Sequence, residues 1–159
     1  MQPIMTTSLA RPWNWGIVVV TDNSATGELP DIEPGRVVSA NETGLVILIR
    51  HAQDIDDDLN DDSDDDGDPD LAEGSVSAAF HHGPVDVHPE RQLVYEGTLL
   101  TPSGTIHIGD AELSVAVPAG ASETRVLVSV SAADDSSPDQ IWLDLWSQDP
   151  AFTADMLAP

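Results

Sequence analysis

A chain of 159 residues with 29 Asp and Glu against 5 Lys and Arg carries a formal net charge of −24, which disfavours binding to nucleic acid phosphates or to an anionic membrane. The length predicts one domain, residues 1–150, followed by a short C-terminal tail at 151–159. The absence of cysteine excludes disulfides, thiol nucleophiles and thiolate metal sites, and it fits a cytoplasmic location.

Short apolar runs bounded by turn residues follow one another along the chain, and helical spacing is nearly absent. The N-terminal segment lacks the basic-then-apolar order of a signal peptide, and no segment is long enough to span a bilayer, so we expect a soluble protein. Strands are predicted at 15–21, 36–40, 44–51, 75–82, 92–100, 105–108, 112–117, 124–131 and 140–146. This pattern favours an all-β fold, an antiparallel β-sandwich or flattened barrel of about eight or nine short strands with one wet face on each sheet.

An acidic tract separates the third and fourth predicted strands. Residues 54–70 read DIDDDLNDDSDDDGDPD and belong to a long acidic loop at 54–73. Such a segment repels itself at neutral pH, so it must stay solvated, bind cations or meet a basic partner. A salt-adapted or highly soluble protein carries a similar net charge, and this alternative stays open.

Part of the tract matches a calcium-binding pattern. Residues 62–73 fit the template D-x-D-x-D-G-x5-E, in which oxygen ligands at alternate positions wrap a hard cation. The candidate ligands are Asp62, Asp64, Asp66, Asp68 and Glu73. Because the flanking segments read as strands, calcium would bind as in sandwich domains with calcium-binding loops rather than in a helix–loop–helix site. A tract without ordered metal is the alternative, and no cofactor is required.

The last predicted strand has two different faces. Its aliphatic residues share one face: Ile141, Leu143 and Leu145. Its other central residues share the opposite face: Trp142, Asp144 and Trp146. If the aliphatic face is core, two tryptophans flank a carboxylate on the outside, a composition enriched at binding surfaces. The alternative is that a loop, or Trp13 and Trp15, covers both of these tryptophans.

The sequence offers little support for catalysis. No HExxH, Gly-x-Ser-x-Gly or glycine-rich phosphate motif is present. The histidines are interpreted as surface residues: His51, His81, His82, His88 and His107. Ser103 lies in a Thr-Pro-Ser-Gly turn, so it is interpreted as a turn residue rather than a nucleophile. We therefore expect that the protein is not an enzyme.

The second half of the chain resembles a known family. Residues 93–112, LVYEGTLLTPSGTIHIGDAE, are followed by VPAG at 117–120, RVLV at 125–128 and QIWLDLW at 140–146. This succession of strands, a Ser-Gly turn, an acidic turn and a closing acidic strand resembles the competence protein J family, inhibitors of a DNA-entry nuclease. The resemblance covers roughly residues 92–147, and the Asp-rich insertion at 54–70 departs from the family pattern.

The resemblance implies a non-catalytic inhibitor or immunity-like protein that binds a basic protein partner, such as a nuclease, through carboxylates. The tract carboxylates would steer the partner: Asp56, Asp57, Asp58, Asp61, Asp62, Asp64, Asp65 and Asp66. The anchors would be Trp142, Asp144 and Trp146. A calcium-binding β-sandwich is the alternative function, and the sequence leaves the oligomeric state open.

Overall fold

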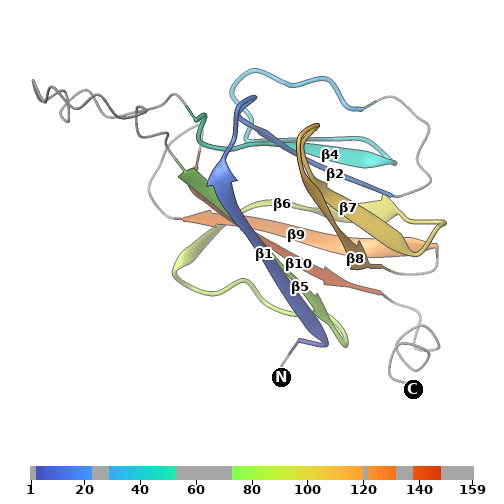
Figure 1. Cartoon of the computed structure of the whole chain (residues 1–159). Coiled ribbons are helices and arrows are strands. Elements are labelled where there is room, and N and C mark those ends of the chain that lie inside the picture. The colour runs from blue at the N-terminus through green and yellow to red at the C-terminus, as the bar shows by residue number, and fades with distance from the viewer. Residues whose placement is uncertain (1–2, 23–28, 53–72, 120–121, 132–137, 148–159) are drawn as a thin grey trace, which may run out of the picture.

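Two five-stranded sheets face each other in the computed structural model (Figure 1). The model describes residues 3–22, 29–52, 73–119, 122–131 and 138–147. In sheet order, the first sheet contains β1 (Met5–Pro12), β5 (Glu73–His81), β10 (Gln140–Trp146), β9 (Glu123–Ser131) and β6 (Arg91–Leu100). The second contains β3 (Val38–Ala40), β4 (Gly44–Leu48), β2 (Ile17–Asp22), β7 (Thr105–Gly109) and β8 (Ser114–Pro118). The sheets stay open at their edges, which confirms the predicted β-sandwich.

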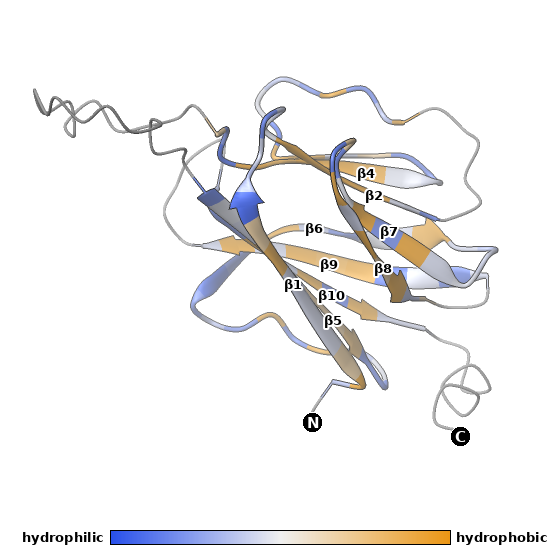
Figure 2. Ribbon diagram, in the orientation of Figure 1, coloured by the Kyte–Doolittle hydropathy of each residue, from blue (hydrophilic) through white to orange (hydrophobic). Residues whose placement is uncertain are grey.

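Alternation of apolar residues decides which face of each strand is buried. In β5, Val76 and Phe80 are buried while the intervening Ser77 and Ala79 are only partly covered. Figure 2 shows how apolar residues concentrate in the strands and polar residues in the connections. The buried residues of both sheets form one hydrophobic core between them. Each of the nine predicted strands is present in the structure, with ends that differ by a few residues at most.

Strand β1 escaped the prediction. Its sequence MTTSLARP has no apolar run, and it lies at the edge of the first sheet, where β5 is its one partner among the described strands. An edge position tolerates Pro12 because the outer side of the strand needs no ladder hydrogen bond. Long-range pairing with β5, from Met5 opposite Phe80 to Pro12 opposite Glu73, holds the strand in place.

The outer face of the first sheet is drier than predicted. Leu127 and Ser129 lie on the side of β9 that was expected to be wet, yet both are buried. The connection 82–90 leaves β5 and must pass β10 and β9 to reach β6. Its residues Val85 and Asp86 lie beside outward residues of β1, β5 and β10. This crossover covers a face that strand alternation alone assigns to solvent.

Tyr95 gives the stability of the fold a pH dependence that can be measured. It is the single tyrosine of a chain without lysine, so no other tyrosine and no lysine titrates in the same pH range. A register shift between Leu93 and Tyr95 places Tyr95 opposite Val128, with its ring packed on the core. Burial raises the pKa of Tyr95 above 10.0, while the nearby Arg125 acts in the opposite direction. The folded state therefore binds the phenolic proton more tightly than the unfolded state does.

We expect this contribution to be fully present below about pH 10 and lost as the pH rises through the raised folded pKa. An ultraviolet absorbance titration checks the shift, and urea unfolding at about pH 9 and about pH 11 checks the stability. The control is Tyr95→Phe, which should remove this part of the pH dependence. Equal titration of Tyr95 in the folded and the urea-unfolded chain would contradict the expectation.

Candidate functional site

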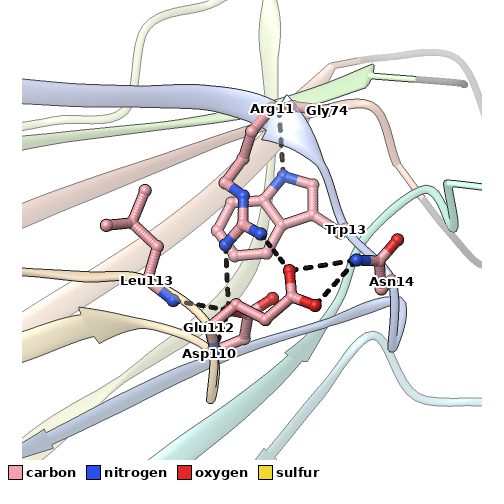
Figure 3. A network of polar contacts seen from close by, with 7 residues as sticks. All are labelled: Arg11, Trp13, Asn14, Gly74, Asp110, Glu112 and Leu113. Carbon is pink, nitrogen blue, oxygen red and sulfur yellow. Dashed lines mark hydrogen bonds and ion pairs between the residues drawn. The ribbon is translucent and has the colours of Figure 1, made fainter.

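Both described ends of the acidic tract meet at one tryptophan. The backbone oxygen of Trp13 accepts a hydrogen bond of 2.9 Å from the amide of Ala52, where the chain leaves for the tract. Its indole Nε1 donates a hydrogen bond of 3.0 Å to the carbonyl of Gly74, where the chain has returned (Figure 3). Trp13 is completely buried. We call Trp13, Ala52 and Gly74 the mount; residues 53–72 between them lie outside the described residues.

The mount needs a glycine at position 74. A Cβ on Gly74 would come within 2.9 Å of the side chain of Ile49 and 3.2 Å of the Trp13 ring. Backbone and ring can therefore approach closely only because Gly74 lacks a side chain. The Trp13 ring and the Ile49 side chain thus explain why β5 has a glycine at its second position.

A charged cluster ties the mount to the second sheet (Figure 3). Arg11, at the end of β1, donates through Nη1 to Asp110 Oδ1 at 2.9 Å and through Nη2 to Glu112 Oε2 at 2.7 Å. Both carboxylates belong to the turn between β7 and β8. Asn14 also donates to Glu112, and the Arg11 guanidinium lies 5.2 Å from the centre of the Trp13 ring. The cluster fixes the β7–β8 turn against the mount.

The predicted anchors do share one outer face, but they differ in exposure. Trp142 is half-buried and Asp144 is largely buried, while Trp146 is only 5% exposed. Trp142 and Asp144 line a groove of about 750 Å³ between β1, β5, β10 and the connection 82–90; we call it the Trp142 groove. Within it, Arg91 stacks 4.2 Å from the centre of the Trp142 ring.

One histidine departs from the surface interpretation. His81 Nε2 lies 2.8 Å from Asp144 Oδ1, and the two side chains are only 11% and 12% exposed. The outer face that holds His81 is the one that the crossover covers, which explains its burial. His82 and His88 are exposed, and His51 and His107 are partly exposed. Ser103 lies in the turn between β6 and β7 as predicted, where its hydroxyl donates to Asp22 Oδ1 at 2.8 Å.

Most residues predicted to bind a partner or a metal lie in the tract. The structure does not describe Asp56, Asp57, Asp58, Asp61, Asp62, Asp64, Asp65, Asp66 and Asp68. Glu73 is described, and its side chain is exposed at the first position of β5. Among the described residues, no three His, Cys, Asp or Glu side chains are grouped so that they could hold a metal ion. Nor does the described part of the chain contain a helix of the length and apolar character that a membrane span requires.

The structure contains a second groove, which was not predicted from the sequence. It occupies about 430 Å³ on the outer face of the second sheet, and we call it the Trp15 groove. It is lined by Trp15, Ile17, Val19, Thr21, Leu29, His107, Gly109, Asp110, Ala111 and Ser114. The signal for it is in β2, where Ile17 and Val19 put apolar side chains on the face opposite the core residues Val18 and Val20. Strict alternation would have placed polar residues there.

The architecture is shared with known proteins. No protein-family model and no curated protein sequence matches this chain. Among solved structures, ComJ from Bacillus subtilis, the inhibitor of the DNA degrading activity of NucA, matches with a TM-score of 0.56 over 92% of this chain and 97% of ComJ. The chain has the ComJ fold.

The sequence identity to ComJ is 12%, so the likeness concerns the fold. A second structure, described as crocagin biosynthetic gene J, matches with a TM-score of 0.52 and 10% identity over 91% of this chain and 98% of that one. The resemblance stated from residues 92–147 is thus confirmed at the level of the fold, and ComJ-like architecture extends well beyond that segment.

Proposed function

We propose that this protein is a non-catalytic inhibitor that binds a basic protein, such as a nuclease, through the carboxylates of residues 54–70. One observation carries the proposal: the residues that flank an Asp-rich tract, Ala52 and Gly74, are both hydrogen-bonded to the buried Trp13. They belong to a sandwich whose fold is shared with ComJ, an inhibitor of a nuclease. Such an inhibitor needs no catalytic residue, and the proposal assigns none.

The charge of the chain suits a basic partner. Nucleases present Arg and Lys side chains to DNA phosphates, and a row of carboxylates can take the place of those phosphates. A net charge of −24 also attracts a cationic protein over distances of about one Debye length, roughly 10 Å at 0.1 M salt. The tract carboxylates therefore raise the rate of encounter and turn the basic site of the partner toward the tract.

The mount fixes where these charges are presented. Ala52 and Gly74 are hydrogen-bonded to the same buried tryptophan, so the tract leaves and re-enters the sandwich at one place. Holding both ends removes part of the conformational freedom that a free acidic tail would lose on binding. The attachment of both flanking residues to one buried tryptophan thus favours the tract as a binding element over a merely solubilising segment.

A DNA degradation assay tests the proposal. Purified nucleases, NucA among them, are incubated with the protein at about 50 mM and about 500 mM salt, and the remaining DNA cleavage is measured. We expect stoichiometric loss of cleavage for at least one nuclease at low salt, with weaker inhibition at high salt. A panel in which every nuclease cleaves equally well with and without the protein would contradict the proposal.

Calcium binding by residues 62–73 is the second candidate, favoured by the template match in the sequence. Thermal unfolding with millimolar calcium separates the two functions. If the tract serves a protein partner, monovalent salt of equal ionic strength should reproduce any calcium effect. A calcium-specific rise in Tm that persists in high salt and disappears in the triple variant Asp62→Asn, Asp64→Asn, Asp66→Asn would instead support the metal site.

A further inference from the structure

The surface that holds the partner after encounter can be inferred separately; this step rests on the proposed function. We propose that the Trp15 groove, rather than the Trp142 groove, receives an apolar side chain of the basic partner, with a cationic side chain of the same partner beside Asp110. The tract then supplies attraction at long range, and the groove supplies the short-range contact that slows dissociation.

Exposure distinguishes Trp15 from the other tryptophans. Trp15 is 51% exposed and Leu29, which also lines the groove, is 48% exposed, whereas Trp13 and Trp146 are buried. Exposed Trp and Leu side chains above an apolar floor lose water-accessible surface when a partner side chain enters between them. Tryptophan is also the residue type most enriched among dominant contacts in protein interfaces.

Asp110 indicates the charge of the occupant. Asp110 is one of the residues that line the groove, and its side chain is only 2% exposed. Oxygen Oδ1 accepts from Arg11 and from the amides of Glu112 and Leu113, whereas Oδ2 is buried and has no hydrogen-bond partner among the described residues. An unsatisfied buried carboxylate oxygen favours the arrival of a donor, and the basic partner can supply one next to its apolar side chain.

The groove adjoins the root of the tract. Trp15 belongs to the short link between the mount and β2. This link is tight, since the amide of Gly16 donates to the backbone oxygen of Trp13 at 3.1 Å. Glu112, beside Asp110, has a 43% exposed side chain and adds negative charge to the rim. Arg11 is paired with both carboxylates, so its own charge is already balanced there. One partner surface can therefore cover the mount and the groove together.

The Trp142 groove offers a basic partner less. Arg91 covers the Trp142 ring and presents a cation at the groove, in a lining that also contains Asp86 and Asp144. A partner cation that approaches the Trp142 ring is repelled by Arg91. The Asp144 carboxylate already contacts His81. Of the three anchors predicted from the sequence, only Trp142 thus keeps appreciable exposure, and Arg91 already covers one face of its ring.

Inhibition by groove variants tests the inference. The variants Trp15→Ala and Leu29→Ser are compared with Trp142→Ala and with Leu93→Ser, a matched control because Leu93 is 45% exposed on the first sheet. We expect the half-inhibitory concentration against the inhibited nuclease to rise at least about ten-fold for Trp15→Ala and to change less than about two-fold for both comparison variants. Unchanged inhibition by both groove variants, or a loss confined to Trp142→Ala, would overturn the inference while leaving the proposed function intact.

A second measurement does not depend on a nuclease. The tripeptides Arg-Phe-Arg, Arg-Ser-Arg and Glu-Phe-Glu, all with blocked ends, are titrated into isotope-labelled protein, and amide and indole chemical shifts are followed. Saturable shifts at the Trp15 indole and in β2 and β7, given by Arg-Phe-Arg alone and abolished in Trp15→Ala, would support the inference. Shifts centred elsewhere, no saturation, or a self-association of the protein that Trp15→Ala abolishes would overturn it. Failure of the proposed function would show separately, as a wild-type protein that inhibits no nuclease.

Discussion

Replacing Trp13 by alanine is expected to lower the free energy of unfolding by about 3–5 kcal/mol, the range for truncating a fully buried large aromatic side chain. Trp13 is completely buried and is the largest member of the core. Its loss removes packing beside Gly74, leaves the Gly74 carbonyl without its indole donor, and takes away the ring beneath Arg11. For a chain of this size that is a large share of the total stability.

Urea unfolding followed by far-ultraviolet circular dichroism measures this change without relying on the tryptophan signal. Two variants serve as comparisons. Trp15→Ala, two residues away and half-exposed, should change the unfolding free energy by less than about 0.5 kcal/mol. Trp13→Phe keeps most of the volume but not the hydrogen bond to Gly74, so its effect should fall between the two. Equal effects of Trp13→Ala and Trp15→Ala would show that the mount is not the structural centre inferred from its contacts.

The strands could be predicted from the sequence because burial in a sandwich follows local alternation and turn residues. The aliphatic face of β10, for instance, is fully buried as expected at Ile141, Leu143 and Leu145. Strand β1 could not be found this way, since its stability comes from pairing with a segment more than sixty residues away. The same holds for the parallel pairing of β5 with β10, which no local pattern encodes.

The candidate site was predictable only in part for the same reason. The charge of the tract is a property of composition, so the sequence shows it directly. The Trp15 groove combines residues of the link between β1 and β2, of β2, β7, the β7–β8 turn and β8, and of the segment between β2 and β3. Only the fold brings them together. The contact of His81 with Asp144 depends on the pairing of β5 with β10, which follows from strand order rather than from a local pattern.

Neutralising part of the tract is expected to slow partner association by about ten-fold or more at low salt, with a much smaller change in the dissociation rate. The test variant replaces four carboxylates by the isosteric amide: Asp56→Asn, Asp57→Asn, Asp58→Asn and Asp61→Asn. The rates are measured by surface plasmon resonance against a nuclease that the wild-type protein inhibits, across a series of salt concentrations. The slope of the association rate against salt should become shallower, because fewer charges act on the partner.

The control separates local charge from total charge. It replaces four exposed acidic residues, each by its isosteric amide. No ion pair is found for these four among the described residues: Asp31, Glu42, Glu90 and Glu123. Each set changes the formal net charge from −24 to −20, so a purely global attraction would slow association equally in both variants. Carboxylates that face the partner act over a shorter distance and are screened less, so the tract variant should lose more. Equal losses in the two variants would mean that the tract has no special position in the complex and that the excess charge serves attraction or solubility in general.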